Sequence, residues 1–150
     1  MLKKCLLIFL VFTLFSCGYE PLYIKKGAPN LKIKSLVMEG DKKINRKISP
    51  IFNLKENENK ETGYQLKLNS EKKIEVVSKD KIGNPSVYRT TITVNFDIFD
   101  DNKIIKSKIF LTSFTYNSNK NKFDLSQYQK GIEENLINEI IEKIFIFLRS

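Results

Sequence analysis

The feature that most constrains this chain is its N-terminal segment. Two lysines precede an uninterrupted apolar run from Cys5 to Phe15, and Ser16 and Cys17 follow directly. A membrane-spanning helix needs about 20 apolar residues, whereas the apolar core of a secretory signal has about 7 to 15. We therefore expect residues 1–16 to be a signal peptide that is removed, with a retained anchor helix as the alternative.

The end of this segment, Leu14-Phe15-Ser16-Cys17, resembles the lipobox of bacterial lipoproteins. A leucine stands three places before the cysteine and a small residue just before it, although Phe15 departs from the smaller residue usual at that place. The resemblance implies cleavage between Ser16 and Cys17 and a covalent lipid, including palmitate-type chains, on Cys17. Gly18 at the next position implies transport to the outer membrane, where the two or three chains of a lipoprotein would anchor it on the periplasmic side.

Removal of the signal would leave Cys17 as the only cysteine of the mature chain, so no internal disulfide can form. The total of 150 residues fits one domain. Residues 17–30 contain two prolines and two glycines and indicate an acylated tether, which leaves residues 31–150 for a single domain.

The net charge of +9 favours anionic partners, because a basic field concentrates anions. The basic residues are 23 lysines and only three arginines, so a codon bias toward lysine explains the charge equally well. The shortage of arginine and the expected export both argue against nucleic acid as a partner. Because the chain has no histidine, imidazole is excluded as a general base or zinc ligand.

Alternating apolar residues predict a first strand that ends near Gly40. The residues of its apolar face are Leu31, Ile33 and Val37. From Asp41, the expected N-cap, the spacing becomes helical, and Pro50 keeps this helix short or kinked. Its apolar stripe consists of Ile44, Ile48 and Ile51.

Residues 55–62 are polar and charged and predict a loop, after which Gly63 opens an extended segment. Its apolar residues share one parity and favour one long strand over two short ones: Tyr64, Leu66, Leu68, Ile74 and Val76. Residues 79–85 have the composition of a turn. The most regular alternation of the chain follows and predicts a third strand, whose apolar face carries Tyr88, Ile92, Val94, Phe96 and Ile98.

A fourth strand is expected from Ile104 to Tyr116, with large residues on both faces. Ile109 and Leu111 point away from the face that carries the aromatic residues, so they lie either on an ordinary open face or against a partner. Asp124 and Gln127 predict a capping box at the start of a long C-terminal helix. Its two apolar stripes are Tyr128, Ile132, Leu136, Ile140 and Ile144, and Ile137, Ile141, Phe145 and Leu148.

The element order β-α-β-β-β-α predicts an α+β fold. We expect a two-layer sandwich in which both helices pack on one face of a four-stranded sheet. The other face of the sheet would then be polar or available for contacts.

Several stretches resemble the LptE family of lipopolysaccharide-assembly lipoproteins, in its alphaproteobacterial form. They are Cys17 to Tyr23 (CGYEPLY), Pro85 to Phe99 (PSVYRTTITVNFDIF), Ser107 to Phe110 (SKIF) and the amphipathic C-terminal helix. The resemblance covers residues 17–150 and implies the same two-layer fold. It also implies a plug for a large outer-membrane β-barrel (an LptD-like partner) that assists barrel assembly and the insertion of lipopolysaccharide, with no enzymatic activity and no cofactor beyond the lipid on Cys17.

Lipopolysaccharide carries phosphates and carboxylates, so a binding surface would present basic residues near the ends of the strands. The candidates are Lys79, Lys81, Arg89, Lys106 and Lys108. For any one of them, a solvated polar face is the simpler interpretation.

No nucleophile elbow, metal-ligand cluster or phosphate-binding glycine loop is present in the sequence, so no catalytic or metal-binding residue is expected. Asp97, Asp100 and Asp101 are explained by turn formation. The alternative to a barrel plug is an auxiliary lipoprotein subunit of an envelope transporter of lipids or solutes.

Overall fold

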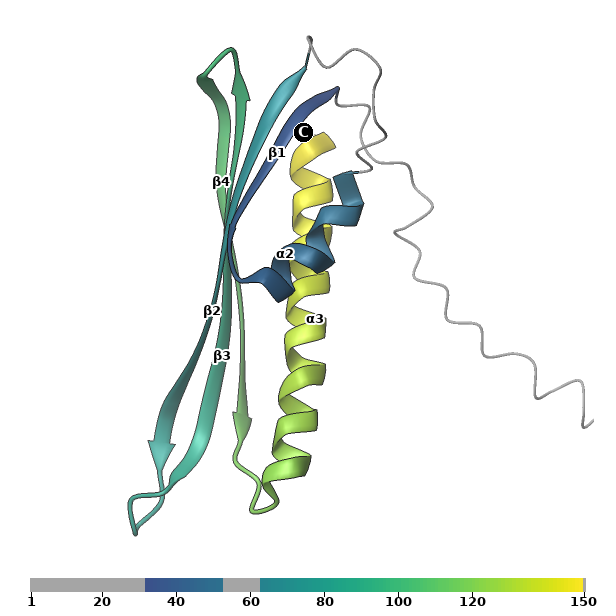
Figure 1. The fold of residues 1–150 in the computed structure, drawn as a ribbon. Coiled ribbons are helices and arrows are strands. Elements are labelled where there is room, and N and C mark those ends of the chain that lie inside the picture. Colours follow the sequence, from purple (N-terminus) through teal and green to yellow (C-terminus); the bar gives the residue numbers. More distant parts are fainter. Residues whose placement is uncertain (1–31, 53–62, 150) are drawn as a thin grey trace, which may run out of the picture.

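The computed structural model describes residues 32–52 and 63–149. Its elements are β1 (Ile33–Gly40), α2 (Lys42–Ile48), the 3-10 turn η2 (Ser49–Phe52), β2 (Tyr64–Lys79), β3 (Pro85–Asp100), β4 (Lys103–Asn117) and α3 (Lys122–Arg149). Both helices lie on one face of a four-stranded sheet (Figure 1). The predicted α+β fold and element order are confirmed. The expected signal peptide, the tether and the loop at 55–62 lie outside the described residues.

The strands are arranged in the order β1-β2-β3-β4. β1 is parallel to β2, whereas the other neighbouring pairs are antiparallel hairpins. β1 pairs only with Tyr64–Ser70, the first part of the 16-residue strand β2. Beyond Ser70, β2 therefore has β3 on one side and no strand of the described chain on the other.

The predicted apolar face of β1 is wrong at Val37. Leu36 and Met38 pack against the core, whereas Val37 is 37% exposed. The cause is a register shift between Ile33 and Ser35, which turns Ile33 toward the core together with the residues of opposite parity. An alternation that continues across a bulge cannot be read from sequence spacing alone.

The long strand β2 confirms the preferred prediction, but its apolar face is not covered over its whole length. Leu66 and Leu68 are fully buried, whereas Ile74 and Val76 remain nearly half exposed. β1 and α2 do not extend past the first part of β2, and the β2–β3 hairpin bends away from α3 (Figure 1). The apolar face of β2 is therefore buried only in its first part, beside β1, α2 and α3.

The core lies between the sheet and the helices. Phe96 stacks on Phe52 of η2 at 5.7 Å between ring centroids and meets the edge of Phe147 from α3 at 6.2 Å. The predicted alternation of β3 is confirmed, because its helix-facing residues from Thr90 to Ile98 are buried. In β4, Phe110 and Tyr116 are buried as predicted, whereas Phe114 on the same face is 45% exposed. The buried apolar residues of the two strands are Ile92, Val94, Phe96, Ile98, Phe110 and Tyr116.

The passage from β1 into α2 is fixed by close backbone contacts. Gly40 has a φ of +88°, and a Cβ at this position would lie 1.9 Å from the carbonyl oxygen of Ser70. Asp41 then caps α2 as predicted, since its carboxylate accepts from the backbone N–H groups of Lys43 (2.8 Å) and Ile44 (3.1 Å). Asn45 accepts a 2.7 Å hydrogen bond from the Ser70 hydroxyl, which ties the helix to β2.

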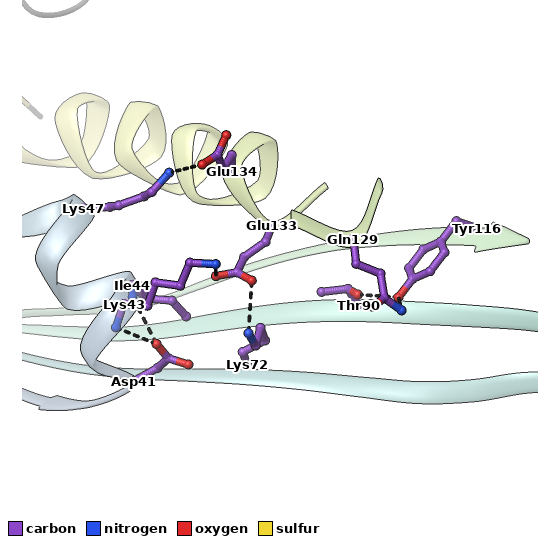
Figure 2. Close-up of polar contacts among 10 residues, drawn as sticks. All are labelled: Asp41, Lys43, Ile44, Lys47, Lys72, Thr90, Tyr116, Gln129, Glu133 and Glu134. Carbon is purple, nitrogen blue, oxygen red and sulfur yellow. Dashed lines mark hydrogen bonds and ion pairs between the residues drawn. The ribbon is translucent and has the colours of Figure 1, made fainter. Parts of the chain in front are cut away.

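A buried carboxylate joins both helices to the sheet. Glu133 of α3 is 5% exposed and contacts Lys72 of β2 (3.0 Å) and Lys43 of α2 (2.9 Å), as Figure 2 shows. Burial alone would raise the pKa of the Glu133 carboxyl, but the two lysines outweigh it and hold its pKa below the usual value. The carboxylate is therefore ionised in the folded state at neutral pH.

The start of α3 differs from the predicted capping box. The helix begins at Lys122, and the side-chain oxygen of Asn121 accepts from the N–H groups of Phe123 (2.9 Å) and Asp124 (3.4 Å). Asp124 consequently lies inside the first turn, where its charge favours the helix N-terminus. Asparagine caps helices as well as aspartate does, and Asn121 lies three residues before Asp124 in the chain.

Two glycines provide a matched test of the junction. Gly40→Ala should destabilise the protein by about 3 kcal/mol or more, because its methyl group would overlap a backbone oxygen at a positive φ. Gly131→Ala should stabilise it by about 0.5 to 1 kcal/mol, because a Cβ there meets nothing in the middle of α3. Urea unfolding of both variants measures the difference, and equal effects would contradict the described junction.

Candidate functional site

The five basic residues selected from the sequence do not form one site. Lys79 ends β2 and Lys81 lies in the β2–β3 turn, at one end of the sheet. Lys106 and Lys108 lie near the start of β4, at the opposite end. Arg89 lies on the sheet face that the helices leave open.

Arg89 is held by neighbouring side chains. Its Nε donates to the Thr115 hydroxyl at 3.2 Å, and Glu75 lies opposite it on β2. Lys73, and to a smaller degree Arg89, hold the pKa of the Glu75 carboxyl below its usual value. The guanidinium charge is therefore partly balanced within the sheet, which makes Arg89 a weaker candidate for binding an anion.

Lys79 and Lys81 lie on an exposed hairpin tip. Asp80 lies between them in sequence and holds the turn together, because its carboxylate accepts from the N–H groups of Ile82 (3.0 Å) and Asn84 (2.8 Å). The tip thus carries two lysines beside an aspartate, and among the described residues neither lysine makes a cation–π contact of the kind that Lys106 and Lys108 make.

Lys106 and Lys108 converge on one aromatic ring. Their ammonium groups lie 5.5 and 5.3 Å from the ring centroid of Phe147 in α3, and Lys108 lies 5.6 Å from that of Phe110. Phe110 and Phe147 meet edge to face at 5.8 Å. We call these four residues the lysine–phenylalanine ledge.

The ledge has the properties of a surface for phosphate-bearing ligands. Both lysines are exposed, and neither is paired with a carboxylate in the described part of the chain. The ammonium groups make cation–π contacts with the rings, and the half-buried Phe147 adds apolar area beside the charges, whereas Phe110 is buried. Such a surface suits a ligand that combines an anionic head with hydrocarbon, as an acidic glycolipid does.

Sequence spacing shows that Lys106 and Lys108 share one face of a strand, but it does not reveal Phe147. That ring comes from the last turns of α3 and reaches the ledge through helix packing. The predicted stripes assigned Phe145 to the sheet, and Phe147 proved to be the residue in contact with Phe96 and Phe110.

Within residues 32–52 and 63–149, no three cysteine, aspartate or glutamate side chains are grouped to hold a metal ion. The described helices also include none that is both long and apolar enough to cross a membrane.

The fold has close counterparts among solved structures. Rare lipoprotein B from Shewanella oneidensis matches with a TM-score of 0.60 at 14% identity, over 77% of this chain and 94% of that chain. A minor lipoprotein from Acinetobacter baumannii matches with a TM-score of 0.56 at 17% identity, over 77% of this chain and 90% of that chain. An uncharacterized lipoprotein B from Nitrosomonas europaea matches with a TM-score of 0.57 at 9% identity, over 89% of this chain and 94% of that chain.

No protein-family model matches the sequence, and no curated protein does. At these identities the structural matches establish the fold alone. The chain therefore has the same two-layer architecture as these lipoprotein structures, and the match covers 90 to 94% of their chains.

The ledge can be compared with the hairpin tip because each carries two lysines. In the unacylated Cys17→Ser chain, Lys106→Gln together with Lys108→Gln should weaken binding to vesicles containing lipopolysaccharide by about ten- to thirtyfold, since each lysine near an anionic surface contributes about 1 kcal/mol. Lys79→Gln together with Lys81→Gln removes the same charge and should have a clearly smaller effect. Vesicle sedimentation measures both, and equal losses would show that only net charge matters.

Proposed function

We propose that this chain is a lipoprotein of the outer membrane, anchored through Cys17. Its domain would seat in a large β-barrel of the LptD type and assist assembly of that barrel and the insertion of lipopolysaccharide. The observation that carries the proposal is the shared fold: the two-layer domain matches solved lipoproteins over 90 to 94% of two of their chains. The N-terminal sequence of this chain independently has the features of an acylated export signal.

The anchor follows from the sequence around Cys17. A single acyl chain holds a protein on a membrane only marginally, whereas two or three chains hold it stably. Residues 17–30 would then connect the lipid to the domain, whose first strand begins at Ile33. The domain would remain next to the membrane surface at the periplasmic side.

A role as a plug is supported by the open face of the sheet. The lumen of a membrane barrel is polar, so a domain lodged inside it needs a polar surface rather than an apolar one. The internal strand β3 meets this requirement over most of its length on the face away from the helices, whereas Ile109 and Leu111 of the edge strand β4 are apolar on that face. The residues of β3 there are Arg89, Thr91, Thr93, Asn95 and Asp97.

A role in lipopolysaccharide handling is supported by the lysine–phenylalanine ledge. Its two ammonium groups lie beside aromatic rings at one end of the sheet, a combination that fits the phosphates and adjoining acyl chains of lipid A. Such a surface binds and orients its ligand and needs no covalent chemistry. We accordingly propose a binding and scaffolding role without enzymatic activity.

Affinity purification from detergent-solubilised membranes tests this function. A tagged chain should recover a large β-barrel protein and should sediment with the outer membrane in a sucrose gradient. Cys17→Ser should abolish membrane retention, whereas Cys5→Ser, in the segment expected to be removed, should leave retention unchanged. Recovery of an inner-membrane transporter, or of no barrel, would contradict the proposal and favour a transporter subunit.

A further inference from the structure

The outer edge of β4 is an unpaired strand edge in the described part of the chain. β4 is the last of the four strands and pairs only with β3. The backbone N–H of Ser118 donates to Ser86 at 2.8 Å, which fixes the hydrogen-bonding parity of this hairpin. Odd-numbered residues of β4, including Ile109 and Leu111, therefore direct their N–H and C=O groups toward the free edge.

The two free edges differ in how their charged side chains are distributed, because the lysines of β4 lie only in its first part, up to Lys108. Residues 71–79 of β2, where β1 no longer pairs, carry five charged side chains, a common protection against unwanted strand pairing. Residues 109–117 of β4 (IFLTSFTYN) carry none. This uncharged second part of the β4 edge is suited to pairing with another strand.

Apolar side chains along this edge are also exposed. Ile109 is 67% and Leu111 57% exposed on the open face of the sheet, and Phe114 is 45% exposed on the helix face. These residues contribute little to the protein's own core. A strand placed alongside β4 would cover all three.

We propose that the β4 edge is a strand-pairing interface and that a second copy of this chain occupies it in antiparallel orientation. Pairing about Phe110 sets Ile109 opposite Leu111 of the other copy. It also sets Lys106 and Lys108 opposite the uncharged Phe114 and Thr112, so no two charges face each other across the pair. Parallel pairing would instead bring each lysine close to its own equivalent.

The interface would be symmetric, because each strand offers the other the same residues. Lys143 of α3 reaches the outward carbonyl of Leu111 at 3.4 Å, a long contact that a backbone N–H of the second strand would replace. This proposed dimer does not depend on the proposed function, which concerns a different partner, the β-barrel.

Sedimentation equilibrium of the full chain in excess detergent tests the pairing. The wild-type protein should change from monomer to dimer as its concentration rises. Leu111→Lys places a charge at the centre of the edge and should weaken dimerisation at least about tenfold. Ile82→Lys introduces the same charge at a still more exposed position, 83%, in the β2–β3 turn, and should dimerise like the wild type.

Circular dichroism should show that both variants are folded, because neither replaced side chain belongs to the core. A wild-type protein that stays monomeric at every concentration would overturn the proposal, including the case in which it binds a strand of a barrel partner instead. Dimerisation of Leu111→Lys with wild-type affinity would overturn it as well. Recovery of a barrel by the Leu111→Lys chain is a separate result that reports on the proposed function alone.

Discussion

One buried carboxylate determines how the two layers of this protein meet. Glu133 places a negative charge in the space between α3, α2 and β2, and the ammonium groups of Lys43 and Lys72 neutralise it there. An ionised group in such a place is costly unless it is paired, so the three elements must stay in register with one another. The contact lies just past Ser70, where β1 stops pairing with β2. Both helices are thereby held on the same face of the sheet, at the level of the short strand.

This arrangement leaves specific surfaces uncovered. With both helices on one face, the opposite face of β3 remains polar and accessible. α3 continues along β4 and brings Phe147 to the two lysines of the ledge, but it leaves the outer edge of β4 without a covering element. The same packing that completes the core thus creates a polar face, a basic aromatic ledge and a free strand edge, each suited to a different kind of contact.

Much of the fold could be predicted from the sequence, because apolar residues recur with the periods of strands and helices. The long alternation in β3 and the helical spacing after Asp41 depend on local geometry alone, and both predictions were confirmed. The error at Val37 came from a bulge in β1, and the wrong cap for α3 came from two adequate capping residues close together. Neither the core-facing side of β1 nor the capping residue of α3 is determined by the local sequence alone.

The candidate sites were harder to predict, since each combines residues that are distant in the chain. Lys106 and Lys108 were selected individually, but the ring of Phe147 joins them only after α3 packs on the sheet. Glu133 looks like one more charged residue of a helix until its two lysine partners are placed. Sequence patterns identify the faces of each element, whereas tertiary packing decides which faces meet.

Acid unfolding of the wild type and of Glu133→Gln tests most directly whether this carboxylate joins the layers. The pKa of Glu133 is lowered by folding, so its stabilisation should be fully present above the pKa of the unfolded chain and lost as the pH falls through the lower folded value. Near neutral pH the variant should be less stable by about 1 to 2 kcal/mol, a modest loss because both lysines are partly exposed. The difference should disappear in acid, and the exposed control Glu134→Gln, which loses a pair with Lys47, should resemble the wild type throughout. A difference that does not depend on pH, or equal effects of the two substitutions, would contradict the central role of Glu133.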